Sequence, residues 1–347
     1  MKESNKKLHN QSIKIKSRVL LKRILFNSDV SPISFRLKKD AIKKKLKLKP
    51  NRINNFIKII NGAYPSITIS LLDIGARSGL LSPYIYLTKM RNFNLEGIEP
   101  DKEEVNAIMN QPNKYGPYNK MYPVVLSDKI GTSPLYITKM LGCTSIYKPN
   151  YERIKGYTKS PYYDIIKKIS VPTTTLETLY PNKERFDFIR LDVQGAEFKV
   201  LMGGKKMFKE AIGISLEANF CEIYEKQKLF QHMHKLMLEN GFRLIILDYS
   251  TLDGEITECG DCVYIKDPEE IKTKEDLIKR ILFSLLWEKE DYVEFLMRNY
   301  GDNFLSQSEK GLFLKKLKIK LKSNASTTHD GISAKNYERG EGYYHQQ

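Results

Sequence analysis

The stretch Ile69-Ser-Leu-Leu-Asp73-Ile-Gly75-Ala-Arg77-Ser-Gly79 decides the fold. Its apolar run at 69–74 predicts a buried strand, and an acid and two glycines stand where that strand ends. A loop of this kind, which then opens a helix, lets the backbone approach a nucleoside-type ligand where a side chain would collide. The spacing is D-x-G-x-x-x-G, which differs from the G-x-G-x-x-G of dinucleotide-binding folds.

Further strand-like runs follow and are separated by segments of helical periodicity. Strands are expected at 95–99, 122–126, 186–192, 212–217, 242–248 and 262–266, and helices at 80–90, 102–110, 196–208 and 225–240. This alternation predicts an α/β fold with a mostly parallel, seven-stranded sheet and helices on both faces. Such sheets bind ligands beyond the carboxyl ends of their strands, so we look for functional residues there.

Two of the predicted strands end in residues suited to an adenosine. Glu99 ends the second strand, about 20 residues after the glycine loop, where a carboxylate can accept hydrogen bonds from both hydroxyls of a ribose. Ser127 and Asp128 follow the third strand, where a short polar pair can reach an adenine amino group. Glu99 alone is equally typical of a helix-capping acid, but its pairing with the glycine loop favours adenosine binding.

The fourth strand is followed by Asp192-Val-Gln194-Gly-Ala-Glu197, which places two carboxylates and an amide around a glycine turn. Either carboxylate can serve as a general base. Asp192 can equally bind a cofactor or a metal ion, and Glu197 can equally be an acid favoured by the dipole at a helix start.

The chain carries 58 basic and 41 acidic residues, for a net charge of +17. Most of that charge lies in residues 1–50, with a net +13. We predict a basic, partly helical arm there, which either lies on an acidic surface, membrane or nucleic acid, or is a solvated extension. The remaining chain is nearly neutral, so the charge does not identify the reaction.

Four cysteines are too few for a disulfide scaffold and indicate a reducing compartment. Cys259 and Cys262 form a lone C-x-x-C without a second pair, so we expect no metal site. The sequence shows no leader peptide and no apolar run of about 20 residues, so no transmembrane segment is expected. We expect a cytoplasmic protein, which the arm can also hold at a membrane surface.

The predicted catalytic domain spans residues 51–266 and carries an insertion at about 129–180 over the ligand face. Tyrosines gather between 145 and 163, where they either stack on a planar acceptor or pack the insertion. A helical extension is expected at 267–322 and a disordered polar tail at 323–347.

Seven motifs occur in order between about residues 69 and 266. They are Asp73-Ile-Gly-Ala-Arg-Ser-Gly79, Ile98-Glu-Pro-Asp101, Leu126-Ser-Asp128, Cys143-Thr-Ser-Ile-Tyr-Lys-Pro-Asn150, Val171-Pro-Thr-Thr-Thr-Leu-Glu177, Phe186-Asp-Phe-Ile-Arg-Leu-Asp-Val-Gln-Gly-Ala-Glu197 and Ile223-Tyr-Glu-Lys-Gln-Lys-Leu-Phe230. Together they resemble the FkbM-type methyltransferases, a branch of the S-adenosylmethionine-dependent class I methyltransferases. The resemblance implies a Rossmann-like fold, S-adenosylmethionine as cofactor, and transfer of its methyl group to a hydroxyl of a small molecule, sugar or glycolipid.

The resemblance also assigns residues. Cofactor binding falls to Asp73, Gly75, Ala76, Arg77, Gly79, Glu99, Ser127, Asp128 and Asp192. Asp192, Gln194 and Glu197 match the family's D-x-[EQ]-G-x-E signature, and Asp192 and Glu197 are the catalytic candidates. Arg77 departs from the pattern, because many members carry Asn there.

Two other functions stay open. An RNA methyltransferase would use the basic arm as its electrostatic footprint. Ribose methylation at caps commonly uses a Lys-Asp-Lys-Glu tetrad, and the absence of a lysine from residues 215–219 counts against it. A non-catalytic binding protein on the same fold is the third alternative, and the intact glycine loop and acids argue against it. The oligomeric state cannot be read from the sequence.

Overall fold

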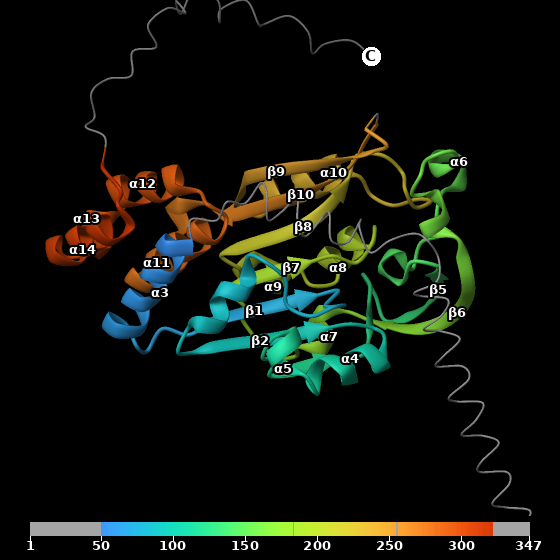
Figure 1. Ribbon diagram of the computed structural model, residues 1–347, viewed down its shortest axis with the longest axis horizontal. Coiled ribbons are helices and arrows are strands. Elements are labelled where there is room, and N and C mark those ends of the chain that lie inside the picture. The colour runs from blue at the N-terminus through green and yellow to red at the C-terminus, as the bar shows by residue number, and fades with distance from the viewer. Residues whose placement is uncertain (1–49, 183, 255, 322–347) are drawn as a thin grey trace, which may run out of the picture. The chain divides into compact units, whose positions relative to one another are not determined.

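The computed structural model describes residues 50–182, 184–254 and 256–321. Its centre is a large twisted sheet with helices around it (Figure 1). The predicted tail at 323–347 and the predicted arm, apart from Pro50, lie outside the described residues. Pro50 is the first residue of helix α3 (Pro50–Ala63), which the sequence patterns did not reveal.

The large sheet has seven strands. In spatial order they are β3 (Lys120–Tyr122), β2 (Phe93–Ile98), β1 (Ile69–Ile74), β7 (Phe188–Leu191), β8 (Gly213–Asn219), β10 (Ile256–Lys266) and β9 (Phe242–Leu252). Neighbouring strands pair in parallel from β3 to β8, and only β10 runs against its two neighbours. The predicted mostly parallel, seven-stranded sheet is therefore confirmed.

The strand order reverses direction beside β1. From β1 the chain moves outward to β2 and β3, and it then returns to place β7 on the other side of β1. The segments that leave β1 and β7 therefore lie side by side at the carboxyl edge of the sheet. Parallel sheets bind ligands at this switch point.

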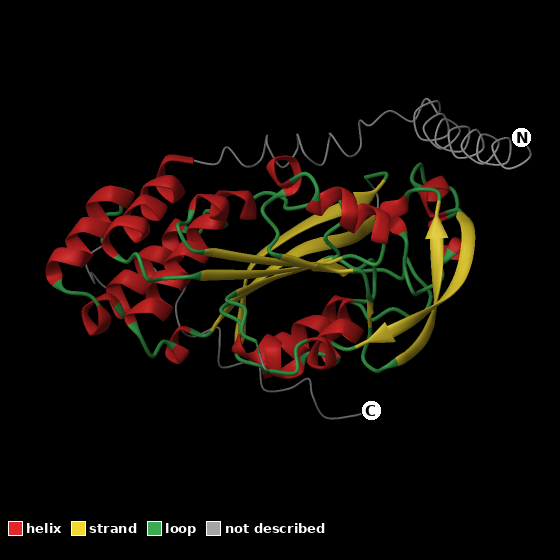
Figure 2. Cartoon of the chain, turned by 90° about the horizontal axis from the view of Figure 1, so that it is seen from below, coloured by secondary structure: helices red, strands yellow, loops and turns green. Residues whose placement is uncertain are grey.

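Two apolar cores lie on the two faces of the sheet, because successive side chains of a strand point to opposite sides. Leu71 and Phe188 belong to one core, and Leu72 and Ile189 belong to the other. Figure 2 shows the helices on both sides of the sheet. The first core includes residues of α3, α11 (Lys274–Leu286) and α12 (Glu290–Asn299), and the second includes residues of α8 (Glu197–Met202), α9 (Lys205–Glu210) and α10 (Phe230–Glu239).

The shorter helices complete the layers. They are the 3₁₀ helices η1 (Tyr84–Lys89), η2 (Leu141–Cys143), η3 (Ser160–Tyr163) and η4 (Pro268–Glu270), and the α-helices α4 (Lys102–Met109), α5 (Pro112–Tyr115), α6 (Tyr151–Ile154), α7 (Leu176–Leu179), α13 (Gly301–Phe304) and α14 (Gln307–Leu317). The segment 80–90 thus holds a 3₁₀ helix, and the single helix predicted at 196–208 is interrupted at Gly203 and Gly204.

The third predicted strand, 122–126, is wrong as a single strand. β3 ends at Tyr122, and the chain resumes at β4 (Val125–Leu126) in a second, three-stranded sheet of order β4-β6-β5. Pro123 lies between the two and has no backbone N–H to continue a ladder. β4 pairs with β6 (Ile165–Thr174), which in turn pairs with β5 (Gly131–Thr138), at the end of the molecule toward which β1 and β2 point (Figure 1).

Phe283 anchors α11 to the large sheet. Its side chain is fully buried, and its ring centroid lies 4.9 Å from that of Phe188. Gly213 of β8 leaves room for this ring, since a Cβ at residue 213 would lie 2.4 Å from it. We expect Phe283→Ala to lower the free energy of unfolding by about 3–5 kcal/mol, as measured by urea denaturation, because the cavity cannot refill.

The matched control is Leu312→Ala on α14. This side chain is 38% exposed, so its truncation should change the free energy of unfolding by no more than about 0.5 kcal/mol. Equal effects of the two substitutions would contradict the assignment of Phe283 as the anchor.

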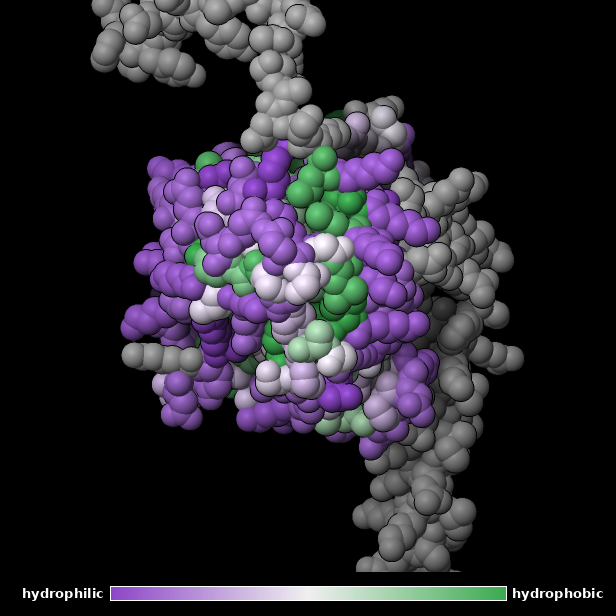
Figure 3. All heavy atoms as spheres, turned by 90° about the vertical axis from the view of Figure 1, so that its left-hand side faces the viewer, coloured by the Kyte–Doolittle hydropathy of each residue, from purple (hydrophilic) through white to green (hydrophobic). Residues whose placement is uncertain are grey.

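The end of the molecule that carries the C-terminal helices shows a mostly hydrophilic surface crossed by a hydrophobic strip (Figure 3).

Candidate active site

Asp73 and Arg190 face each other across the switch point. They are register partners on β1 and β7, so their side chains leave the same face of the sheet. Arg190 Nη1 lies 2.8 Å from Asp73 Oδ1, and the Tyr118 hydroxyl donates to Asp73 Oδ2 at 2.6 Å. Asp73 is 0% exposed, and each of its carboxylate oxygens already accepts a hydrogen bond.

Arg190 also reaches the next acid along its own chain. Its Nη2 lies 2.9 Å from Asp192 Oδ2, and its Nη1 donates to the Gly75 carbonyl oxygen at 3.2 Å. Burial acts to lower the pKa of Arg190, but the charges of Asp73 and Asp192 outweigh it, so this pKa is raised above its ordinary value. Asp192 keeps 33% of its side chain exposed, which makes it the member of this group that a ligand can touch.

The glycine loop after β1 makes close backbone contacts that require glycine. Gly75 has φ +82°, and a Cβ there would lie 1.8 Å from the carbonyl oxygen of Asp192. Gly79 has φ +76°, and its Cβ would lie 2.4 Å from the Tyr115 carbonyl oxygen. The amides of Gly75 and Ala76 both donate to the carbonyl of Ile98. The loops after β1, β2 and β7 therefore meet at one place.

Glu99 and Arg77, both predicted at the cofactor site, are brought together. Arg77 Nη2 lies 3.2 Å from Glu99 Oε1 and 2.8 Å from Asp101 Oδ2. The same Glu99 oxygen accepts the amide of Asp101 at 3.0 Å. Burial raises the pKa of Glu99, and this effect outweighs the positive charge of Arg77, which acts to lower the pKa. Arg77 thus ties the glycine loop to the end of β2.

Ser127 and Asp128 follow β4 in the second sheet. The Ser127 hydroxyl is buried and donates to Asp128 Oδ1 at 2.9 Å, and its amide donates to Thr174. The Asp128 carboxylate is half-exposed and lies 3.8 Å from Lys199 Nζ of α8. Their position on a separate sheet follows from the break at Pro123, and their role at an adenine stays a prediction.

Gln194 links the strand end to the tyrosine-rich segment. It adopts φ +54°, and its Nε2 donates to Asp192 Oδ1 at 2.7 Å. The buried Tyr224 hydroxyl donates to Gln194 Oε1 at 3.2 Å and to the Cys143 carbonyl at 2.9 Å. Sequence reasoning quoted both Arg190 and Tyr224 within motifs but gave neither a role. The position of Arg190 two residues before Asp192 was the available signal.

Glu197 is the first residue of α8 and is only 1% exposed. Its Oε1 accepts the amide of Val193 at 2.9 Å, whereas its Oε2 has no hydrogen-bond partner in the described part of the chain. Burial raises the pKa of Glu197 to about 8. This carboxyl is therefore mostly protonated at neutral pH.

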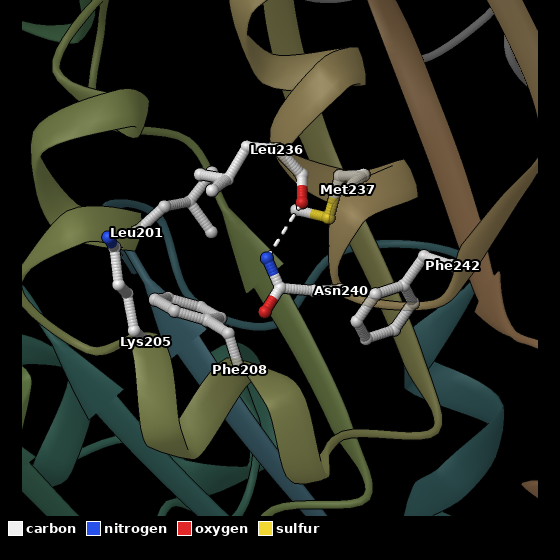
Figure 4. A pocket seen from close by; sticks show the side chains of 7 residues that line it. All are labelled: Leu201, Lys205, Phe208, Leu236, Met237, Asn240 and Phe242. Carbon is white, nitrogen blue, oxygen red and sulfur yellow. Dashed lines mark hydrogen bonds between the residues drawn. The ribbon is translucent and has the colours of Figure 1, made fainter.

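A separate hollow lies between α8, α9 and α10 (Figure 4). It is lined mostly by apolar groups, and the side-chain amide of Asn240 donates to the Leu236 carbonyl at 2.8 Å. The hollow is bordered by Phe242, where β9 begins, and so lies away from the carboxyl edge of the sheet. Within the described ranges no three His, Cys, Asp or Glu side chains are placed to hold a metal ion, and no helix could cross a membrane.

The family model of the methyltransferase FkbM domain matches residues 73–244. The chain therefore contains an FkbM methyltransferase domain. The predicted family and the predicted enzyme class, a methyltransferase, are thereby confirmed. The FkbM span includes both sheets' site residues, from Asp73 on β1 to Tyr224, and it leaves the C-terminal helices outside.

No curated protein matches the chain. Among solved structures, magnesium protoporphyrin IX methyltransferase from Synechocystis with bound SAM is 9% identical, with a TM-score of 0.37, and the match covers 71% of this chain and 89% of that one. The ribosomal protein L11 methylase from Lactobacillus delbrueckii is 8% identical, with a TM-score of 0.31, over 61% of this chain and 77% of that one. These TM-scores are too low to support a conclusion, so the fold rests on the strand order itself.

The buried Glu197 makes a prediction about stability. Because its folded pKa of about 8 exceeds its ordinary value of 4.5, folding takes up a proton, and stability falls as pH rises between these two values. The slope is at most about 1.4 kcal/mol per pH unit. In Glu197→Gln this contribution should vanish, so urea denaturation at about pH 5, 7 and 8 should show a flatter dependence.

Glu239→Gln on α10 is the control, because this side chain is 58% exposed in an (i, i+4) pair with Lys235. It should leave the pH dependence of the wild type unchanged. If Glu197→Gln followed the wild-type curve across this range, the raised pKa would be wrong.

Proposed function

We propose that this FkbM methyltransferase uses S-adenosylmethionine to methylate a hydroxyl of a small molecule, sugar or glycolipid. The observation that carries the proposal is the meeting of three loops at the switch point: the glycine loop at 75–79, the Glu99 carboxylate and the Asp192 carboxylate. The Gly75 N–H and carbonyl are fixed by Ile98 and Arg190, which leaves the loop in one conformation. A preformed loop flanked by two acids suits an adenosine joined to an amino acid.

The residues divide into two groups. Glu99 holds Arg77 and the Asp101 amide through Oε1, and we assign its Oε2 to the ribose hydroxyls. Asp192 is partly exposed beside the glycine loop, and we assign it to the amino-acid end of the cofactor together with Gly75, Ala76 and Gly79. Ser127 and Asp128 are assigned to the adenine. Asp73 contributes through Arg190, because both of its oxygens are already engaged.

The bound cofactor supplies a methyl group that is already activated by its sulfonium, so the protein has chiefly to hold the acceptor oxygen in line and exclude water. We assign removal of the acceptor's proton to the ionised form of Glu197. Its Oε2 accepts no hydrogen bond from the described residues, and a pKa of about 8 lies close to the pH at which a general base works best. Both oxygens of Asp192, by contrast, already accept hydrogen bonds.

Binding of S-adenosylhomocysteine tests the cofactor assignment. Calorimetry on the full chain should show binding by the wild type, and Glu99→Ala should raise the Kd at least about tenfold, since hydrogen bonds to a charged group are lost. Glu309→Ala is the control: it removes a carboxylate on α14 that pairs with Lys274 of α11 and with Tyr64, the residue after α3, and the Kd should not change.

Absence of binding by the wild type, or an unchanged Kd in Glu99→Ala, would contradict the cofactor assignment. The acceptor is tested by incubating labelled S-adenosylmethionine with fractionated extracts of the native host. Label on a small molecule or glycan is expected. Label on RNA, with RNA binding that weakens steeply with salt, would replace the proposed acceptor by the RNA alternative.

A further inference from the structure

We propose that Arg190 is a positioning residue of the cofactor site, which uses the buried Asp73 as an anchor and holds Asp192 and the Gly75 carbonyl in place. The inference rests on the proposed function, because it concerns how the cofactor is bound. Arg190 is itself only 13% exposed, so its role is to position the groups that touch the cofactor.

The anchor is fixed by the sheet. Asp73 and Arg190 are register partners on adjacent parallel strands, so their Cα positions are set by the β1–β7 ladder. Asp73 Oδ2 is held by Tyr118, and a Cβ on Gly97 would lie 2.8 Å from the Tyr118 ring, so this ring is also closely packed. The Asp73 carboxylate is therefore held in one orientation, in which it faces Arg190.

The shape of the guanidinium matters as much as its charge. Nη1 donates hydrogen bonds to Asp73 and the Gly75 carbonyl, while Nη2 donates to Asp192. A single planar group therefore connects β1, the glycine loop and the turn after β7. A lysine carries one compact ammonium and cannot reproduce this fork. Arginine is thus required by geometry at this position.

Asp192 is clamped from both sides. Arg190 holds Oδ2 and Gln194 holds Oδ1, and Gln194 is in turn held by the buried Tyr224 hydroxyl. A carboxylate fixed before the ligand arrives loses little freedom on binding, which favours affinity. Removing Arg190 frees one side of this clamp and leaves the Asp73 charge without its cation.

The test measures S-adenosylhomocysteine binding to the full chain by calorimetry. Arg190→Lys keeps the charge that Asp73 needs but loses the fork, and it should raise the Kd about tenfold; Arg190→Met should raise it further, toward about a hundredfold. Arg243→Met is the matched control. Arg243 makes an equally short, two-pronged pair with Asp267 outside the candidate site, and its loss should leave the Kd unchanged.

A double-mutant cycle separates positioning from a general effect on stability. Asp192→Asn alone should weaken binding, but it should add little in the Arg190→Lys background, because both changes break the same clamp. Additive effects on Kd, or an unchanged Kd in Arg190→Lys, would overturn the inference. Failure of the wild type to bind would instead overturn the proposed function. If Arg190→Met does not fold, the Arg190→Lys cycle still decides.

Discussion

The guanidinium of Arg190 shares its charge between two carboxylates, Asp73 at 2.8 Å and Asp192 at 2.9 Å, at the point where the strand order reverses. Buried ion pairs seldom add much to stability, because the desolvation of the charges offsets their attraction. The main contribution of the Arg190 guanidinium is to fix the positions of the two carboxylates. Two acids that would otherwise repel each other are held at fixed places, and the loops that carry them are held with them.

The backbone enforces the same arrangement. The loop after β1 touches the turn after β7 so closely that residue 75 has no room for a Cβ, and the amides of residues 75 and 76 bind the end of β2. Arg77 adds a further tie to Glu99 and Asp101. The three strand ends consequently behave as one unit, so a change in any of them should be felt by the other two.

The features that the sequence predicted well are those set by local pattern. The first strand was predicted with its observed bounds because an apolar run ends sharply at a glycine loop, and Glu99 was placed at the end of the second by its spacing. The role of Arg190 was missed because its partner Asp73 lies 117 residues away, and only the sheet brings them together. The strand at 122–126 failed because apolar residues continue through Pro123, although the ladder does not. Helix α3 was missed although the basic segment ends at its first residue, Pro50, and proline commonly occupies the first position of a helix.

The two acids of the Asp192–Glu197 turn occupy opposite environments, and neither environment could be read from their spacing. Asp192 is partly exposed, with a cation on one oxygen and an amide on the other. Glu197 is buried, and among the described residues of the FkbM span it alone keeps a buried side-chain atom without a hydrogen-bond partner. The other such atoms, on Arg280, Trp287, Glu288 and Tyr292, lie in α11, in α12 and in the turn between them. Enzymes that need one acid to bind and another to move a proton commonly separate two such groups by environment. A paired carboxylate gains little by accepting a proton, whereas an unpaired buried one accepts it readily, and our proposal of binding by Asp192 and proton transfer by Glu197 rests on this difference.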